Sequence, residues 1–279
     1  MGIIVGTTFF PTWLFQGYEK MHWIAISNLV AKISGLILVL TFVNSNSDLW
    51  LAILIQSLVS IVAAIIALTT AIIGKYVHIL VPKIEDIIIQ FKLGWSIFLS
   101  TFFVSMYTTS IPLILGYNSG AEAVGIYNAA DKLKQALQGL IGPVSQAIYP
   151  RSNRLMHESR PKAIKFVASI SKILILLMLI SCLFVFSFSD QIVQLAFGVG
   201  NADTSAVLKI IIWIPILVAL ANMLGIQVML PMGLSKTFGI TYVIIGTLGL
   251  PLMFLGSYYG SYIGVSIISL LIELTITLI

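Results

Sequence analysis

The chain has 279 residues, of which 59% are apolar and only 9% are charged, and its mean hydropathy is +1.06. Soluble globular domains are about 45–50% apolar and about 25% charged, so this composition excludes an ordinary water-soluble fold. The net charge of +5 does not predict a nucleic-acid partner, because in a membrane protein the placement of the basic residues matters more than their sum.

In chain order, long apolar stretches predict a partial first span and eight fuller transmembrane helices. A span needs about 20 apolar residues, and backbone polar groups in lipid must be satisfied within a helix or a closed barrel. A barrel is disfavoured because the apolar residues run continuously instead of alternating with polar ones. We therefore predict an all-α, polytopic membrane protein. Its expected spans cover residues 1–15, 23–43, 49–73, 94–116, 123–148, 164–188, 205–230, 238–257 and 263–279.

The segments between the predicted spans alternate in charge. Every second segment is basic, and together these segments hold Lys20, Lys75, Lys83, Lys92, Arg151, Arg154, Arg160, Lys162, Lys165 and Lys236. No Lys or Arg occurs in the other segments, around residues 44–48, 117–122, 189–203 and 258–262. This is a positive-inside pattern, which predicts that the basic segments lie on the inner side of the membrane.

One inner segment, residues 77–93, is expected to be more than a turn. Its apolar residues Ile84, Ile87, Ile88 and Phe91 share one helical face, and polar residues lie between them. This pattern predicts an interfacial amphipathic helix that joins two groups of spans. The alternative is an ordinary solvated loop.

Charged residues at membrane depth are costly, and they usually face a bundle interior or a water-filled cavity. The fifth predicted span contains the sequence YNAADKLKQALQG. One helical stripe of this span holds Tyr127, Asp131, Lys134 and Gln138, and the neighbouring stripe holds the other polar residues. A further lysine, Lys32, lies inside the second predicted span. These polar residues are the candidates for a functional site.

One interpretation of these residues is a cationic cavity suited to an anionic headgroup such as a phosphate or diphosphate. The lysines would bind the anion, and the amide and phenol groups would be available for sugar hydroxyls. The residues of this substrate-binding site would be Lys32, Lys132, Lys134, Asn128, Tyr127 and Gln135. The alternative is that Asp131 and a neighbouring lysine neutralise each other between helices.

Two carboxylates are candidates for coupling transport to protons or ions, Asp131 and Glu273. The spacing leaves Glu273 either as a proton-titrating carboxylate or as the partner of one of the lysines. Lys209 either lines a pathway or extends to the outer surface. The three histidines lie far apart in sequence, and there is no phosphate-binding glycine loop. We therefore expect no metal site, no cofactor and no enzymatic activity.

Two segments resemble a known family. The sequence FFPTWLFQGYEKMHWIAISNLVAK is similar to the end of the fourth helix, the inner loop and the start of the fifth helix in the O-antigen and polysaccharide repeat-unit flippases of the Wzx type. The sequence VGIYNAADKLKQALQGLIGPVSQAIYPRSNRL resembles their eighth helix and the inner loop after it. The matching positions in the second segment are Gly125, Tyr127, Ala130, Lys132, Pro143, Gln146, Tyr149 and Pro150.

The resemblance implies a transporter with twelve helices in two bundles, of which this chain is expected to be a fragment without the first helices. Residues 1–76 would be the rest of the N-terminal bundle, 77–93 the interfacial linker and 94–279 the C-terminal bundle. Such a protein moves undecaprenyl-diphosphate-linked oligosaccharides from the cytoplasmic to the periplasmic leaflet of the bacterial inner membrane by alternating access. Its implied partners are the lipid-linked oligosaccharide, membrane lipids, and the polysaccharide polymerase and chain-length proteins of the same pathway.

Three alternatives stay open. A multidrug exporter of the same superfamily would be expected to have an acidic cavity for cationic drugs, whereas the deep charges here are mostly basic. A membrane glycosyltransferase, polymerase or ligase would need a sizeable outer loop or catalytic carboxylates, and the outer segments are short. The third alternative is a truncated remnant without function.

Overall fold

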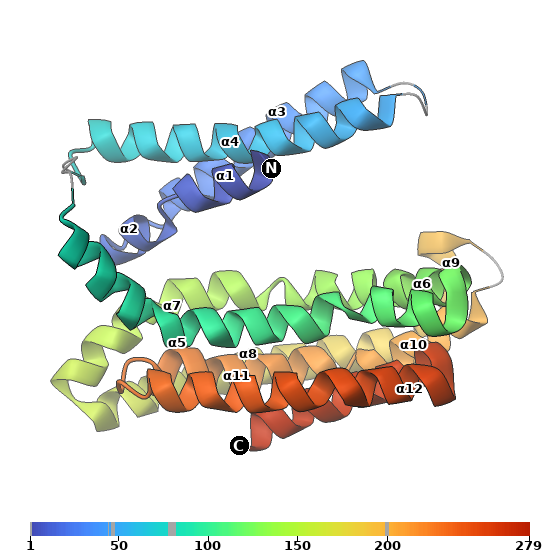
Figure 1. The fold of residues 1–279 in the computed structure, drawn as a ribbon. Helices are drawn as coiled ribbons and strands as arrows, with labels where there is room; N and C mark the ends of the chain where they lie inside the picture. The colour runs from blue at the N-terminus through green and yellow to red at the C-terminus, as the bar shows by residue number, and fades with distance from the viewer. Residues whose placement is uncertain (1, 44, 46–47, 78–81, 199–200) are drawn as a thin grey trace. The chain divides into compact units, whose positions relative to one another are not determined.

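The computed structural model describes residues 2–43, 45, 48–77, 82–198 and 201–279, and every regular element among these residues is a helix (Figure 1). The helices form two compact units, Met1–Pro82 and Lys83–Ile279. The predicted all-α fold is therefore confirmed for the described residues.

The first unit contains four helices: α1 (Gly2–Phe9), α2 (Thr12–Gly17), α3 (His22–Phe42) and α4 (Leu49–Ile73). The predicted partial span 1–15 is broken between α1 and α2, where Pro11 has no backbone N–H to donate. α1 packs against α4 at Gly6, which is buried. A Cβ atom at Gly6 would overlap the carbonyl group of Ser60, so the two helices touch backbone to backbone.

The second unit holds the remaining elements in chain order. They are α5 (Ile84–Thr109), α6 (Ile111–Gln138), α7 (Ile141–Glu158), α8 (Arg160–Ser187), α9 (Ser189–Phe197), α10 (Ala202–Ile211), α11 (Ile214–Leu224), the π-helical turn η2 (Gly225–Met229) and α12 (Ser235–Leu278). The predicted linker 77–93 is partly outside the described residues, which omit 78–81. From Ile84 onward it is helical, and it continues into the following span without a break, because α5 contains no Pro and Gly94 keeps the helical conformation.

Two helices of the second unit fold back on themselves. The backbone leaves the helical region at Gly120 in α6, where φ is 83°, and at Ser261 in α12, where φ is 48°. A Cβ atom at Gly249 would lie 3.0 Å from Ile272, so the two arms of α12 are antiparallel neighbours. Figure 1 shows this reversal in red at the C-terminal end of the chain.

Six stretches of described helix are long and apolar enough to cross a membrane. They are His22–Phe42, Trp50–Ile73, Ile97–Glu158, Arg160–Ser187, Ala202–Met229 and Ser235–Leu278. The predicted number of fuller spans was eight, because the sequence separates Ile97–Glu158 and Ser235–Leu278 into two spans each. The turns at Gly120 and Ser261 lie close to these predicted boundaries.

Large apolar side chains cover the outside of these helices. Leu113 is 75% exposed, Ile173 69% and Leu195 91%. Soluble monomeric proteins rarely expose so much apolar surface, because its contact with water is unfavourable. Contact of the same surface with lipid chains is not unfavourable. Together with the six candidate spans, this surface identifies a membrane protein.

A buried polar contact joins α7 to the π-helical turn. Gln227 is completely buried, and its Nε2 atom donates to the Ser145 carbonyl oxygen at 3.0 Å and to the Ser145 Oγ at 2.8 Å. In return, the Ser152 hydroxyl donates to the Gln227 carbonyl oxygen at 2.7 Å. Because few polar groups lie in this apolar interior, these bonds fix the position of η2 along α7.

Candidate functional site

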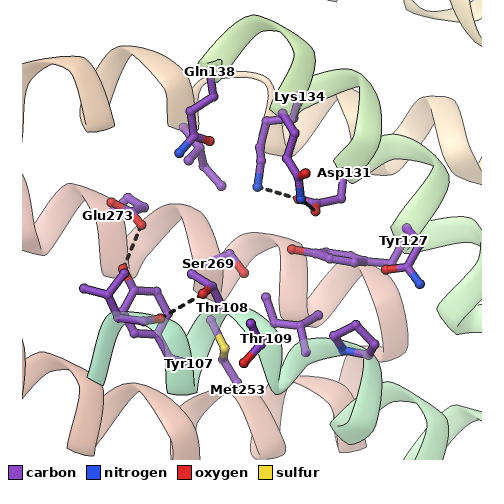
Figure 2. Close-up of a pocket in the computed structure, with 16 residues that line it drawn as sticks. Tyr107, Thr108, Thr109, Tyr127, Asp131, Lys134, Gln138, Met253, Ser269 and Glu273 are labelled. Carbon is purple, nitrogen blue, oxygen red and sulfur yellow. Dashed lines mark hydrogen bonds and ion pairs between the residues drawn. The ribbon is translucent and has the colours of Figure 1, made fainter. Parts of the chain in front are cut away.

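The second unit contains a cavity of about 550 Å³ between α5, α6, α11 and α12. Hydroxyl, amide and charged groups gather there between otherwise apolar helices. The described residues that line the cavity are Val104, Tyr107, Thr108, Thr109, Ile111, Pro112, Tyr127, Asn128, Asp131, Lys134, Gln135, Gln138, Ile214, Met253, Ser269 and Glu273. Figure 2 shows these side chains. We call the space that they line the polar cavity.

One stripe of α6 supplies the central polar groups of the cavity. Tyr127, Asp131, Lys134 and Gln138 are spaced by four, three and four residues, so they share one helical face. All four side chains line the polar cavity (Figure 2). The stripe predicted from the helical period is therefore the face that the structure turns inward.

The charge of Lys134 is neutralised within the same helix. Its Nζ atom lies 2.5 Å from the Asp131 Oδ1 atom, and the side chains are only 13% and 17% exposed. The other carboxylate oxygen, Oδ2, accepts a hydrogen bond from the Gln135 Nε2 atom at 2.5 Å. Both oxygens of Asp131 are thus engaged. The pairing that the sequence left as an alternative is present in the structure.

Glu273 enters the cavity from α12, and its partner comes from α5. The Tyr107 hydroxyl donates to the Glu273 Oε1 atom at 2.9 Å (Figure 2). The sequence did not indicate this contact, since the two residues are 166 positions apart. No ion pair of Glu273 with a lysine is found among the described residues.

The Tyr127 hydroxyl is an unsatisfied donor inside the site. The side chain is only 2% exposed, and its oxygen has no hydrogen-bond partner among the described residues. In Figure 2 the hydroxyl points across the cavity toward Ser269, whose own hydroxyl donates to the Val265 carbonyl oxygen at 2.8 Å. Buried polar groups are nearly always paired, so either a small movement toward the neighbouring Ser269 hydroxyl or a polar group of a ligand would complete its pairing.

The other predicted lysines lie elsewhere. Lys132 is exposed on α6 and does not line the polar cavity, and Lys32 is exposed on α3 in the first unit. Six of the predicted site residues therefore lie in one cavity. They are Tyr127, Asn128, Asp131, Lys134, Gln135 and Glu273. Among the described lining residues, the side chains with a basic or a carboxylic group are Lys134, Asp131 and Glu273.

Lys209 is held between α10 and α9 rather than in the cavity. Its Nζ atom lies 2.9 Å from the Asp190 Oδ2 atom, which joins α10 to α9. Hydrogen bonds from Lys209 and then Ser205 lower the pKa of the exposed Asp190 carboxyl below its ordinary value of 3.8. Among the described residues no cluster of His, Cys, Asp and Glu could hold a metal ion.

Comparison with known proteins shows the family. The profile of the family described as "Polysaccharide biosynthesis protein" matches residues 1–156. A protein of Escherichia coli (strain K12), described as "Putative O-antigen transporter", is 36% identical over 277 residues, which are 98% of this chain and 66% of the relative. A protein of Shigella dysenteriae with the same description is 30% identical over 276 residues, 99% of this chain and 69% of the relative.

The chain thus spans about two thirds of the length of the curated relatives it matches. No solved structure matches it. The family match covers more than half of the chain and includes both segments that carried the resemblance. The chain belongs to the polysaccharide biosynthesis protein family.

Proposed function

We propose that this protein translocates undecaprenyl-diphosphate-linked oligosaccharide repeat units, such as O-antigen or capsule units, from the cytoplasmic to the periplasmic leaflet of the bacterial inner membrane. The O-antigen transport named for both relatives supports this proposal. The observation that carries it is the polar cavity, which lies within apolar helices and contains an unpaired, buried Tyr127 hydroxyl.

Moving a lipid-linked oligosaccharide across the membrane requires a polar site within the hydrocarbon layer. A diphosphate with attached sugars cannot cross about 30 Å of hydrocarbon unaided, so a protein must supply polar contacts inside the membrane. The polar cavity offers amides and hydroxyls, which can exchange hydrogen bonds with sugar hydroxyls as donors and acceptors. Release on the other side would follow from rocking of helix bundles, as in other transporters. Lys32 and Lys132, each exposed on its own unit, stay candidates for contact with the diphosphate.

One observation favours a second function, export of cationic compounds. The described lining of the polar cavity has two acidic side chains and one basic side chain, which suits a cation better than an anion. The names of the relatives point to polysaccharide instead. The two functions predict different cargo for the same cavity, so one variant can test both.

The test is to fill the cavity. Thr109 is exposed and lines the polar cavity at the end of α5, whereas Leu113 is 75% exposed on α6 and does not line it. The protein should restore surface polysaccharide to a strain that lacks its own repeat-unit transporter. Thr109→Trp should abolish this restoration, and the matched control Leu113→Trp should keep it. If Thr109→Trp instead blocks efflux of a cationic dye and leaves the polysaccharide unchanged, the exporter is the correct function.

A further inference from the structure

The cations available inside the polar cavity decide which sugars it can bind. Lys134 is the one Lys or Arg among the described lining residues. Its ammonium is 2.5 Å from Asp131, and both oxygens of that carboxylate are engaged, by Lys134 and by Gln135. An anionic ligand would therefore have to displace Asp131 before it could bind Lys134.

The second acidic side chain of the cavity, Glu273, also offers no cation to an anionic ligand. Glu273 has no ion-pair partner among the described residues, and its contact is with the neutral Tyr107 hydroxyl. A ligand carboxylate placed between Asp131 and Glu273 would lose its hydration without gaining a cation, which is unfavourable in a partly buried site.

Uncharged hydroxyls find better partners in the same space. The Tyr127 hydroxyl is buried and unpaired, and the exposed hydroxyls of Thr108 and Thr109 and the amide of Gln138 line the same cavity. The Thr108 and Thr109 hydroxyls donate to backbone carbonyl oxygens within α5, so they are acceptors toward a ligand. The Tyr127 hydroxyl can donate and the Gln138 amide can do both, and vicinal sugar hydroxyls match both roles. The aromatic ring of Tyr127 adds an apolar wall, and sugars also have apolar faces.

We propose that the polar cavity binds an uncharged sugar and that Asp131 determines this specificity by occupying Lys134. The proposal rests on the proposed function, and it names the class of sugar at that site. Asp131 acts against acidic sugars, such as uronic acids, by removing the cation that would bind their carboxylate. Freeing Lys134 should convert the cavity into one that accepts an acidic sugar.

The test compares two probes that differ in one group. p-Nitrophenyl β-glucoside is neutral, and p-nitrophenyl β-glucuronide carries a carboxylate in place of the hydroxymethyl group. Their binding to the protein in lipid nanodiscs is measured by saturation-transfer NMR, and binding in the cavity is the part of the signal that Thr109→Trp removes. The readout is the ratio of glucuronide to glucoside affinity, which is expected to be well below one for the unmodified protein.

Asp131→Asn keeps the size of the side chain and removes its charge. We expect it to raise the affinity ratio about tenfold, because a charge-assisted hydrogen bond to the freed ammonium becomes available to the glucuronide. Adding Lys134→Gln should bring the ratio back. Glu122→Gln is the matched control, since it removes the same charge from an exposed position of α6 outside the cavity. It should leave the ratio unchanged.

Each outcome bears on a different claim. If the unmodified protein binds both probes equally in the cavity, or if Lys134→Gln does not reverse the effect of Asp131→Asn, the role of Asp131 is refuted. If Asp131→Asn does not fold, Asp131→Ser replaces it with the same expectation. If the unmodified protein shows no Thr109→Trp-sensitive binding of the glucoside, the sugar-binding cavity of the proposed function fails instead.

Discussion

The ion pair between Asp131 and Lys134 can be measured directly by a double-mutant cycle. Exposed pairs contribute about 0–1 kcal/mol, whereas removing one partner of a buried pair costs about 3–5 kcal/mol. The side chains here are 13% and 17% exposed, which is near the buried limit, but they border an open cavity where water screens the charges. We therefore expect Asp131→Asn to lower the free energy of unfolding by about 2 kcal/mol.

The cycle adds Lys134→Gln and the double variant, and it follows equilibrium unfolding in mixed micelles by tryptophan fluorescence. The expected coupling energy is about 1–2 kcal/mol, because each single variant leaves a charge without its partner. The pair of Asp190 and Lys209 is the matched control, since its side chains are 67% and 39% exposed and solvent screening should leave it a much smaller coupling energy. Equal coupling in the two pairs would refute the argument that Lys134 is neutralised in a partly buried site.

Three further outcomes follow from other parts of the fold. Because the pKa of Asp190 is lowered in the folded protein, its contact with α10 stabilises α9 above pH 3.8 and is lost as the pH falls through the lowered value. Hydrogen exchange of α9 should rise there, and Asp190→Asn should remove this pH dependence. Gly6→Ala should destabilise the first unit by about 1–3 kcal/mol, because its Cβ atom would overlap Ser60, whereas Gly17→Ala meets no atom within 4 Å and should not; thermal unfolding distinguishes them. Ser261→Gly should stabilise the protein by about 1 kcal/mol in the same assay, since φ is 48° there, and a loss of stability would contradict this.

Apolar length predicted most of the helices, because a membrane span must satisfy its backbone within the helix wherever it lies. Helix breaks were harder to predict. Pro11 marked the end of α1, but nothing in residues 84–93 distinguishes an interfacial helix from the beginning of a long span. The distinction depends on where the membrane surface lies along α5, and the sequence of residues 84–93 does not determine that position.

The site was predictable where its residues share one helix. The helical period placed Tyr127, Asp131 and Lys134 on one face, and the structure turns that face into the polar cavity. Lys132 shares the neighbouring stripe with Asn128 and Gln135, which do line the cavity, so the helical period alone does not predict that Lys132 stays outside it. The contact of Tyr107 with Glu273 joins two helices distant in sequence, and only their packing reveals it.

The π-helical turn η2 affects which residues share one face of the helix that runs from α11 into η2. Ala219, Met223 and Gln227 are all buried and are spaced four residues apart. In an α-helix each such step advances roughly 40° around the axis, so two steps would carry Gln227 about a quarter-turn away from the face of Ala219. A π turn is wound less tightly and takes back part of this rotation. Deleting Gly225 or Ile226 would therefore turn the Gln227 amide away from Ser145, although every side chain in the contact would still be present.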